Sequence, residues 1–593
     1  MNIDAIQIHC GIDLQKKQVS EIFNEGGVSI YRLDFAFPDG VEAGGISLSL
    51  TFPMLKILQI YSPVSDYSRR RNVVQWFRPT SVHSNFAFGL PSLSTVSDGK
   101  YNYVTVAVAD AENDTDISFC VQDFKECNEV EFQITLLSGR TKKQEYSTLL
   151  RIDEREILLS DTLKEQTEWF LDFYPQTSEI PQASEEPLYS TWYNFHQHPS
   201  ANALYEELKI ARKLGFKSVI IDDGWQYDGN GTSDYIDCGD WAFSKEKFPE
   251  PKAFINAVHT LGMKVAFWFP VPFVGFHTQA YQRFKDKLLY EEGILCDGGG
   301  ATNAGILDVR YKETRDYIVN TVRELMRYGA DGIKLDFVDK FEIREETPFA
   351  NPAMDFQDLN EAVVRLLQEL NEAIRSVKSD AMIEFRQNYV GPSITRFCNM
   401  LRVADCAFDS ITNRIAIADM RMLRYRLAVH SDMLYWAEKE TEENVSRQLL
   451  NVAFAVPQIS VRLKSIPRKH RDIIKSFLTY WTKNRGILLK DKLTAEGIDS
   501  TYVALSAENA QKRIAVLYLA NDFTYTGKRT DIWNASRAEH IFVDCGDYTV
   551  SLRTFDRYGR MISEKISTAI EKVYVPIGGR IECDNENGKI TNA

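Results

Sequence analysis

The sequence predicts three parts: a central parallel (β/α)₈ barrel between an N-terminal β-sandwich and a smaller C-terminal β-sandwich. Short runs of alternating apolar and polar residues occupy both ends of the chain, as in β-sandwiches. Between them, helical and strand patterns alternate, as in parallel α/β folds. The length of 593 residues also exceeds what one hydrophobic core fills, so several domains are expected.

The composition is that of a globular protein, with 44% hydrophobic and 26% charged residues. A net charge of −14 repels phosphate backbones and anionic lipids, so we expect neither nucleic acid nor a membrane as partner. The first residues show no signal-peptide pattern, and the nine cysteines form no C-x-x-C pair. We therefore expect reduced thiols and a cytoplasmic protein. A homo-oligomer is compatible with the sequence.

The N-terminal part, residues 1–180, is expected to be a β-sandwich followed by a linker helix. Runs such as ISLSLTF and EVEFQITLL alternate apolar and polar residues. The segment 160–174 then has a helical pattern, with Ser160 or Asp161 as its N-cap. A polar stretch with prolines follows, and its composition suits a linker.

Residues 181–497 are expected to form the barrel. Three times an amphipathic helix ends in a glycine, at Gly215, Gly262 and Gly329, before a strand of β-branched and aromatic residues. Eight strands close a parallel TIM barrel. The candidates are LYSTWYNF, FKSVIID, MKVAFWF, GIKLDF, AMIEFR, MLRVAD, DMLYW and PQISV. An open, doubly wound sheet is the alternative that strand counting leaves open.

Residues 498–593 return to short strands, such as RIAVLYLAND and HIFVDC, and are expected to form the smaller β-sandwich. We expect both sandwiches to cover apolar surface of the barrel.

A lysine and a carboxylate close the fourth barrel strand, GIKLDF. Active sites of such barrels lie at the C-terminal ends of the strands. With a period of two, Lys334 and Asp336 share one face, while Ile333, Leu335 and Phe337 face the helices. The functional interpretation is a carboxylate that the lysine keeps ionised. A buried structural ion pair is the alternative.

The second strand ends in SVIIDDGWQ, which places Asp222 and Asp223 at its exit and Trp225 just beyond. Two acceptors and an aromatic ring suit a sugar rich in hydroxyl groups. Neighbouring strand residues point to opposite faces, so both acids serve one ligand only if the strand breaks, which Gly224 permits. Otherwise one acid is a helix N-cap or a solvated loop residue.

The sixth strand, in MLRVADCAFD, brings Arg402, Asp405 and Asp409 to another strand exit. Retaining glycosidases need two carboxyl groups roughly 5 Å apart, one as nucleophile and one as acid/base. Alternate strands of a closed barrel can bring Asp336 and Asp405 together in this way.

The motifs TWYNF, IIDDGWQ, LDVR, GIKLDF and RVADCAFD, in this order, resemble those of α-galactosidases of glycoside hydrolase family 36. The resemblance implies the same three-part fold, Asp336 as nucleophile, Asp405 as acid/base, and Asp222 and Asp223 as ligands of galactose hydroxyls. The implied reaction is a double displacement. Asp336 attacks the anomeric carbon while Asp405 protonates the departing oxygen, and Asp405 then deprotonates the water that releases the sugar.

The chain departs from the family pattern around the sugar. Where the family has W-x-E-P-E after strand three, Trp268 is followed here by FPVP, without acids. Where the family has C-x-x-G-G-x-R after strand five, this chain has EFRQNYVGP, and Ala404 replaces the serine before the acid/base. The resemblance therefore implies the reaction class more firmly than the sugar. The residues expected to bind substrate are Asp222, Asp223, Trp225, Lys334, Arg310, Arg386, Asn388, Arg402, Asp409, Trp192 and Trp268.

We expect an exo-acting hydrolase of terminal α-galactosides in oligosaccharides. The same mechanism on an N-acetylgalactosaminide or a pentopyranoside, and a transglycosylase, are alternatives. A Schiff-base aldolase or lyase that uses Lys334 is a different enzyme class, and a sugar-binding protein without turnover is the non-enzyme alternative. We expect no cofactor and no metal, because nucleotide-binding motifs are absent from the sequence and His196 and His198, expected on one strand face, have no third ligand at a suitable spacing.

Overall fold

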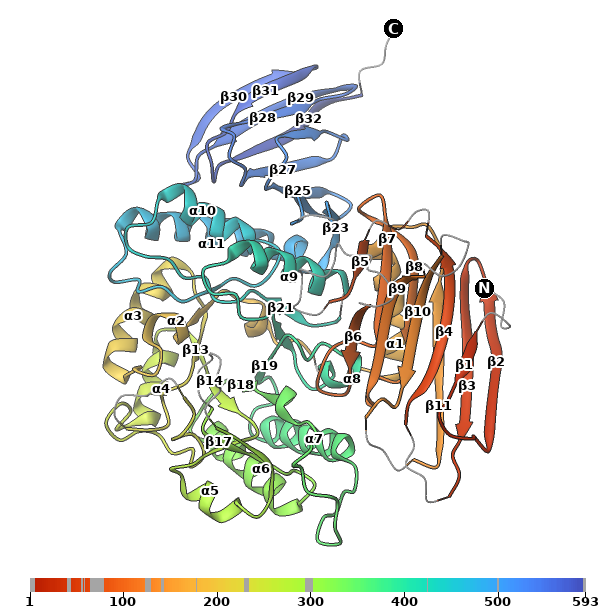
Figure 1. Cartoon of the computed structure of the whole chain (residues 1–593). Coiled ribbons are helices and arrows are strands. Elements are labelled where there is room, and N and C mark those ends of the chain that lie inside the picture. The colour runs from red at the N-terminus through yellow and green to blue at the C-terminus, as the bar shows by residue number, and fades with distance from the viewer. Residues whose placement is uncertain are drawn as a thin grey trace.

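The computed structural model describes residues 6–39, 44–54, 57, 59–63, 79–122, 129–139, 143–176, 179–228, 234–293, 302–423, 425–498 and 501–589. A central barrel with its surrounding helices carries one β-sandwich beside it and a second, smaller β-sheet domain at one end (Figure 1). This is the multidomain architecture that the sequence predicts.

The N-terminal domain consists of two facing antiparallel sheets. One has the order β1-β4-β10-β9-β6 and the other the order β2-β3-β11-β8-β7-β5. Along β4, Ile46, Leu48 and Leu50 are fully buried and alternate with half-buried polar residues, so one face packs into the core between the sheets. Each such side chain contributes roughly 1.5–3 kcal/mol by burial. The strands are β1 Gln7–His9, β2 Lys16–Glu25, β3 Val28–Ala36, β4 Ile46–Pro53, β5 Gln59–Tyr61, β6 Thr80–Ser84, β7 Ser92–Ser97, β8 Tyr101–Val108, β9 Thr115–Gln122, β10 Glu129–Leu136 and β11 Glu145–Asp153.

The linker helix α1 (Leu159–Phe173) follows this domain, but its N-cap is Leu158 rather than Ser160 or Asp161. The carbonyl oxygen of Leu158 accepts hydrogen bonds from the backbone N–H groups of Asp161 and Thr162, so the N-cap lies two residues before Ser160, the earlier of the two expected caps. Asp161 lies in the first turn, where its charge interacts favourably with the helix dipole.

Eight parallel strands form the barrel in the order β21-β20-β19-β18-β14-β13-β12-β22. Isolated parallel bridges between His430 and Val456 and between Leu434 and Ile459 join the two ends of this order, so the sheet is nearly closed. The doubly wound alternative is wrong. The strands are β12 Leu188–Ser190, β13 Ser218–Ile221, β14 Lys264–Pro270, β18 Gly332–Asp336, β19 Met382–Arg386, β20 Met400–Arg402, β21 Ala428–His430 and β22 Gln458–Ile459.

Two of the expected strands differ from those observed. The seventh strand is Ala428–His430, and the apolar segment 432–436, where it was expected, is a largely buried loop after it. The strand was misplaced because its three residues are too few to show a period. The first ends at Ser190, and the short helix α2 (Trp192–Phe195) follows. His196 is the C-cap of α2 with a positive φ of 45°, so His196 and His198 do not lie on a strand face.

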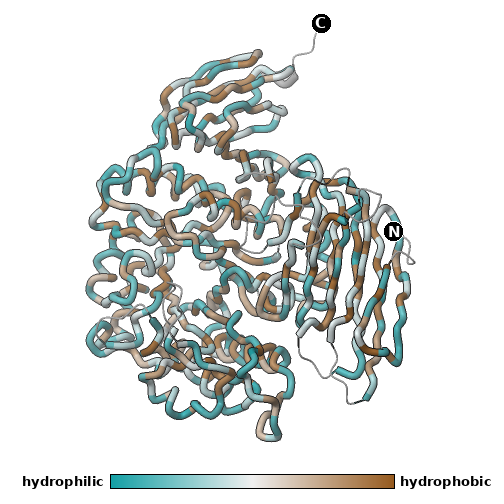
Figure 2. Tube along the Cα trace, viewed as in Figure 1, coloured by the Kyte–Doolittle hydropathy of each residue, from teal (hydrophilic) through white to brown (hydrophobic). Residues whose placement is uncertain are grey.

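The helices around the barrel confirm the repeated helix, glycine and strand pattern. Gly215, Gly262 and Gly329 have φ values of 120°, 72° and 108°, a left-handed conformation that favours glycine after a helix. Hydrophilic residues recur along the helices on the outside of the barrel, whereas residues along the sandwich strands alternate between hydrophilic and hydrophobic (Figure 2). The helices are α3 Ala201–Leu214, α4 Pro251–Thr260, α5 Gln279–Phe284, α6 Lys312–Arg327, α7 Leu359–Val377, α8 Pro392–Thr395, α9 Ser410–Leu423, α10 Glu442–Asn451 and α11 Arg468–Lys490.

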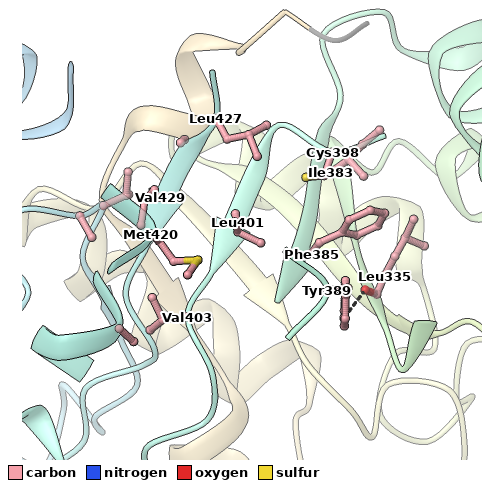
Figure 3. Packing of buried hydrophobic residues seen from close by; sticks show 14 of the residues in the cluster. Leu335, Ile383, Phe385, Tyr389, Cys398, Leu401, Val403, Met420, Leu427 and Val429 are labelled. Carbon is pink, nitrogen blue, oxygen red and sulfur yellow. Dashed lines mark hydrogen bonds between the residues drawn. The ribbon is translucent and has the colours of Figure 1, made fainter. Parts of the chain in front are cut away.

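Buried side chains of β18, β19 and β20 pack against α9 and the segment after β19 (Figure 3). Phe385 lies beside Tyr389, whose hydroxyl donates a 3.1 Å hydrogen bond to the carbonyl oxygen of Leu335. This bond ties the segment after β19 to β18, which carries Lys334 and Asp336.

After β19 the barrel has only the one-turn helix α8, and the N-terminal domain packs there. Phe86 and Leu90 of that domain belong to the barrel core, and the backbone N–H of Gly89 donates a 2.8 Å hydrogen bond to the carbonyl oxygen of Asn388. A Cβ at Gly89, where φ is 69°, would lie 2.3 Å from the carbonyl oxygen of His83, so only glycine fits this close approach. The sandwich therefore covers apolar barrel surface, as expected.

The C-terminal domain has sheets of order β23-β24-β25-β27-β32-β29-β30 and β26-β28-β31. Its first strand begins at Lys492, slightly before the boundary placed at residue 498. The strands are β23 Lys492–Glu496, β24 Ala504–Glu508, β25 Lys512–Leu517, β26 Asp522–Thr524, β27 Arg529–Asn534, β28 His540–Asp544, β29 Tyr548–Phe555, β30 Met561–Ser567, β31 Ile570–Tyr574 and β32 Arg580–Lys589. Throughout the described ranges, every helix is too short or too polar to cross a bilayer.

The barrel also contains an insertion between β14 and α6, in which β15 (Phe273–Gly275), β16 (Leu288–Glu292) and β17 (Ala304–Leu307) form a small antiparallel sheet. The motif LDVR begins at the end of β17, so it lies outside the eight barrel strands.

Candidate active site

Asp336 is the last residue of β18, and donors from three directions surround its carboxylate. Oδ1 accepts hydrogen bonds from Arg386 Nε at 2.6 Å and from the backbone N–H of Phe337 at 2.9 Å. Oδ2 accepts one from Trp268 Nε1 at 3.0 Å, and Lys334 Nζ lies 3.6 Å away. The side chain is only 7% exposed, so the neighbouring strands β14 and β19 hold it in one orientation.

The positive charges decide the protonation state of Asp336. Burial acts to raise the pKa of its carboxyl group, but the charges of Arg386, Lys334 and Arg402 outweigh burial and hold the pKa well below its usual value. Asp336 is therefore a carboxylate throughout the physiological pH range, as a nucleophile requires. The predicted pairing of Lys334 with Asp336 on one face is present.

Lys334 joins the second strand to the fourth. Its Nζ lies 2.8 Å from Asp222 Oδ2. Burial acts to lower the pKa of Lys334, but the Asp222 charge raises it above the usual value, so the ammonium form persists. A lysine in this state is a poor Schiff-base nucleophile, because only a neutral amine attacks a carbonyl group.

Asp222 and Asp223 lie side by side because β13 ends at Ile221 and the chain turns at Gly224, whose φ is 103°. A Cβ at Gly224 would lie 2.6 Å from the Cα atom of Gln197, so the turn requires glycine. The strand break that would let both acids serve one ligand is thus observed.

Asp223 lies in a buried polar network rather than beside a cation. Its two oxygens accept hydrogen bonds from Gln197 Nε2 at 2.6 Å and Gln226 Nε2 at 2.7 Å. Burial raises its pKa to about 6, although these two hydrogen bonds act to lower it. Asp223 can therefore change its protonation state close to neutral pH, whereas Asp336 cannot.

Asp405 follows β20 and contrasts with Asp336 in exposure. Its side chain is 65% exposed, and its Oδ1 lies 2.9 Å from Arg402 Nη2. Partial enclosure acts to raise the pKa of Asp405, but the charges of Arg402, Arg386 and Lys334 lower it below the usual value. Asp336 and Asp405 thus share one set of cations at the C-terminal end of the barrel.

Arg402 is held from below. Its Nη1 lies 2.6 Å from Asp432 Oδ1, and Asp432 Oδ2 accepts hydrogen bonds from Tyr193 Oη at 3.0 Å and from the Cys406 backbone N–H at 2.9 Å. These contacts fix the buried guanidinium group next to Asp405. Arg402 therefore positions the candidate acid/base.

A second buried carboxylate, Glu384 on β19, lies deeper in the barrel. Its Oε2 accepts a 2.6 Å hydrogen bond from Gln458 Nε2, while Oε1 has no hydrogen-bond partner and lies 3.9 Å from Arg402 Nε. Burial raises the pKa of Glu384 to about 7, although Arg402 and Lys334 act to lower it. Glu384 is therefore a second buried carboxyl group whose pKa lies close to neutral.

An aromatic wall lines one side of Asp336. The Trp268 ring stacks on Tyr235 with centroids 5.9 Å apart, and Phe337 stacks on Phe273 at 4.6 Å and meets Tyr235 at 5.2 Å. Phe337 has a φ of 58°, which turns its ring from the helices toward this wall, so the expectation that it faces the helices is wrong.

Several residues expected to bind substrate have other surroundings. Trp225 is fully buried and donates through Nε1 to the carbonyl oxygen of Trp268, so it supports the site from behind. Arg310 pairs with Asp308 at 2.7 Å and donates to the Pro348 carbonyl oxygen.

Three more lie at the edge of the cluster. Asp409 accepts hydrogen bonds from the backbone N–H groups of Ile411 and Thr412, as a cap of α9. Trp192 begins α2 and packs against His196. Asn388, in the segment after β19, accepts a hydrogen bond from the sandwich through its carbonyl oxygen.

Sequence reasoning missed Tyr193, Gln197, Gln226, Tyr235 and Asp432. Two of them had a signal, because Tyr193 lies in TWYNF and Gln226 in IIDDGWQ, the motifs that carry the resemblance. The others come from loops and from the wrongly placed seventh strand. Within the described ranges, no three His, Cys, Asp or Glu side chains are arranged to hold a metal ion.

Known proteins resemble this chain in sequence mainly over the barrel. The Melibiase family model matches residues 170–382. Alpha-galactosidase Mel36A of Lactobacillus acidophilus is 28% identical over 151 residues, 25% of this chain and 19% of that protein. The A type blood alpha-D-galactosamine galactosaminidase of Flavonifractor plautii is 25% identical over 177 residues, 28% of this chain and 15% of that protein. The matched segments thus span under a fifth of these relatives' length.

Structural comparison extends over nearly the whole chain. A variant of the family 36 α-galactosidase AgaA of Geobacillus stearothermophilus, in complex with raffinose, matches with a TM-score of 0.64 at 13% identity, over 95% of this chain and 81% of that one. The resemblance to glycoside hydrolase family 36 that the motifs indicate is confirmed, and so is the three-part fold.

Proposed function

We propose that this chain, a glycosidase of the melibiase type, releases terminal α-galactosyl residues from oligosaccharides with retention of configuration. The observation that carries the proposal is the environment of Asp336: the side chain is buried and fixed at the end of the fourth barrel strand by Arg386, Trp268 and Lys334, and the two cations favour its ionised form. Such a carboxylate is suited to form a glycosyl ester.

The hydrogen bonds favour one oxygen of Asp336 for attack. Oδ1 accepts two hydrogen bonds of 2.9 Å or less, whereas Oδ2 accepts one at 3.0 Å and has Lys334 at 3.6 Å. Oδ2 therefore keeps a lone pair with weaker partners. We assign the attack on the anomeric carbon to Oδ2, with Arg386 anchoring Oδ1 while the ester forms.

Asp405 supplies the proton and later removes one from water. Its exposed side chain can follow the departing oxygen, and Arg402 beneath it retains contact while Asp405 changes charge. Enclosure by a bound sugar removes water from Asp405 and so raises its pKa, which favours the protonated form that the first step needs.

The sugar-binding part of the proposal rests on Asp222 and Asp223. Asp222 is held by Lys334, and Asp223 by two glutamines, so both present fixed acceptors to ring hydroxyls. The aromatic wall of Trp268, Tyr235 and Phe337 can cover the apolar face of the ring. The unpaired cysteines among the described residues support a reducing compartment, and we propose the cytoplasm.

A second candidate substrate has a specific basis. No acid follows Trp268 directly, since Phe269, Pro270 and Val271 occupy the segment, and all three are buried. A sugar whose substituent ends in a methyl group, such as an N-acetylgalactosaminide, loses less by binding near this segment than a fully hydroxylated ring does.

The test is a panel of nitrophenyl α-glycosides with a chelator present, with the products followed by proton NMR. We expect the galactoside to be hydrolysed and the α-anomer of galactose to form first. Turnover of the N-acetylgalactosaminide or the xyloside alone would keep the mechanism and change the sugar. First formation of the β-anomer, or trapping of Lys334 by borohydride with a carbonyl substrate, would overturn the proposal.

A further inference from the structure

An exposed aromatic ring lies on the loop directly after the candidate acid/base. Phe408 is 73% exposed and follows Asp405 by three positions. Its ring meets that of Tyr435 edge to face, with centroids 5.1 Å apart and an interplanar angle of 87°. The two residues come from the segments after β20 and β21, two adjacent barrel strands.

The loop that carries Phe408 is connected to the catalytic machinery by hydrogen bonds. The Asp409 backbone N–H donates to the carbonyl oxygen of Cys406 at 2.9 Å, which forms a tight turn around Phe408. The Cys406 backbone N–H in turn donates to Asp432, the carboxylate that holds Arg402 beneath Asp405. The turn that carries Phe408 is therefore tied to the residues that hold Arg402 and Asp405.

Folding stability does not explain this arrangement. A phenylalanine that is 73% exposed gains little from burial, and Phe408 has a φ of 63°. A left-handed backbone is strained at a non-glycine residue, and such residues cluster at functional sites. This strained conformation presents an aromatic ring to solvent at the mouth of the barrel.

We propose that Phe408, supported by Tyr435, forms the subsite for the leaving group, where the apolar face of a pyranose ring stacks. The inference rests on the proposed function. If Asp405 protonates the departing oxygen, the leaving group must lie immediately beyond Asp405, on the side where this loop lies. Sugar rings present C–H groups on one face, and aromatic rings pack against such faces.

The subsite predicts the substrate class. An aglycone with a ring, as in a galactosyl disaccharide or in raffinose, contacts Phe408, whereas the methyl group of a methyl α-galactoside is too small to cover it. The chain should therefore select oligosaccharides over simple alkyl galactosides, and the selectivity should depend on the Phe408 ring.

The test compares Phe408→Ala and wild type on melibiose, the α-1,6-linked galactosyl-glucose disaccharide, and on methyl α-galactoside. We expect kcat/KM for the disaccharide to fall about 10-fold, equivalent to about 1.4 kcal/mol, and that for the methyl glycoside to change less than about twofold. Phe23→Ala, which removes a 44% exposed ring from β2 of the N-terminal domain, is the matched control and should change neither value.

A second variant separates this function from folding. Phe408→Gly relieves the positive φ and should melt at or above the wild-type temperature while it loses the same selectivity for the disaccharide. Equal kcat/KM changes on both glycosides, or no change on the disaccharide, would overturn the subsite while leaving the proposed function intact. A change in oligomeric state on sedimentation with unchanged selectivity would instead assign the ring to a contact between copies. Turnover of neither glycoside by the wild type would overturn the proposed function and the subsite with it.

Discussion

The two candidate catalytic carboxylates have opposite surroundings. Asp336 is 7% exposed, and close hydrogen bonds reach both its oxygens from three different residues. Asp405 is 65% exposed and has one close charged partner, Arg402. The difference matches their proposed chemistry, because a nucleophile must stay ionised and in place, whereas an acid/base must exchange protons with substrate and water.

The same cations serve the two groups differently. Arg386 contacts Asp336 directly, while Arg402 contacts Asp405 and acts on Asp336 only through its charge. Removal of one carboxylate or one cation therefore should not produce the same defect as removal of another.

Replacement of the nucleophile should have the largest effect. Asp336→Asn should lower kcat by about 10⁴-fold or more for every leaving group, because an amide forms no glycosyl ester. The measurement is turnover of dinitrophenyl and methyl α-galactosides. External azide should attack the opposite face of the sugar and give the β-azide with an Asp336→Ala variant. Residual turnover that rises steeply with a better leaving group would contradict the assignment.

Replacement of the acid/base should have a smaller, selective effect. Asp405→Ala should slow hydrolysis of an unactivated galactoside by about 10²–10⁴-fold, while a dinitrophenyl galactoside should still show a burst because its departure needs little protonation. Azide should restore turnover and give the α-azide. Asp409→Ala is the control, since Asp409 only caps α9. Near wild-type rates for Asp405→Ala on the unactivated substrate would place the acid elsewhere.

Removal of the cation at Asp336 should shift a pH profile rather than abolish activity. The pKa of Asp336 is below its usual value partly because of Arg386, so Arg386→Gln should raise that pKa. The nucleophile then becomes protonated at a higher pH, and the acidic limb of kcat/KM should move toward neutrality. Arg344→Gln, which removes a partly exposed guanidinium paired with Glu292, should leave the limb in place. An unmoved limb in Arg386→Gln would show that the contact does not set the charge of Asp336.

The sequence predicts the two candidate catalytic carboxylates, but not all of the residues that surround them. Lys334 and Asp336 were predictable because strand alternation is a local property, and Gly224 signalled the turn beside Asp222. The burial of Trp225 was not predictable, since a G-W dipeptide is equally compatible with an exposed ring. Tyr235 lies in a long loop after β13, where no period indicates its direction.

The position of Arg310 shows a second limit. The motif LDVR suggested a sugar contact, but Arg310 pairs with Asp308 two residues earlier in the insertion. Asp432 was missed because three-residue strands such as β21 carry no readable period, so the seventh strand was placed over the loop that contains it. The domain boundaries at residues 180 and 497 stay predictions.

The smallest effect on catalysis is expected at the buried Glu384, whose titration changes the stability of the fold instead. Its pKa is about 7 in the folded protein and near 4.5 when unfolded, so the folded state binds more protons between these values and stability falls as pH rises from about 4.5 to 7. At about 1.4 kcal/mol per pKa unit, the loss is about 3 kcal/mol. Glu384→Gln should flatten this part of the curve in urea unfolding. Asp223, with a pKa of about 6, leaves a smaller slope of the same sign. The same fall in Glu384→Gln as in wild type would contradict the assignment.

If Asp336 forms the glycosyl ester, that ester can be trapped on the protein and located in its sequence. The protein would be incubated with an activated fluorinated α-galactosyl fluoride that forms the intermediate quickly and releases it slowly, then digested and sequenced by tandem mass spectrometry. Fragment ions must separate Asp336 from Asp339 on the same peptide, and Asp336→Asn is the matched control. We expect one sugar on Asp336 in the wild type and none in the variant. A label on Asp339 or Asp405, or inactivation without any ester, would contradict this expectation.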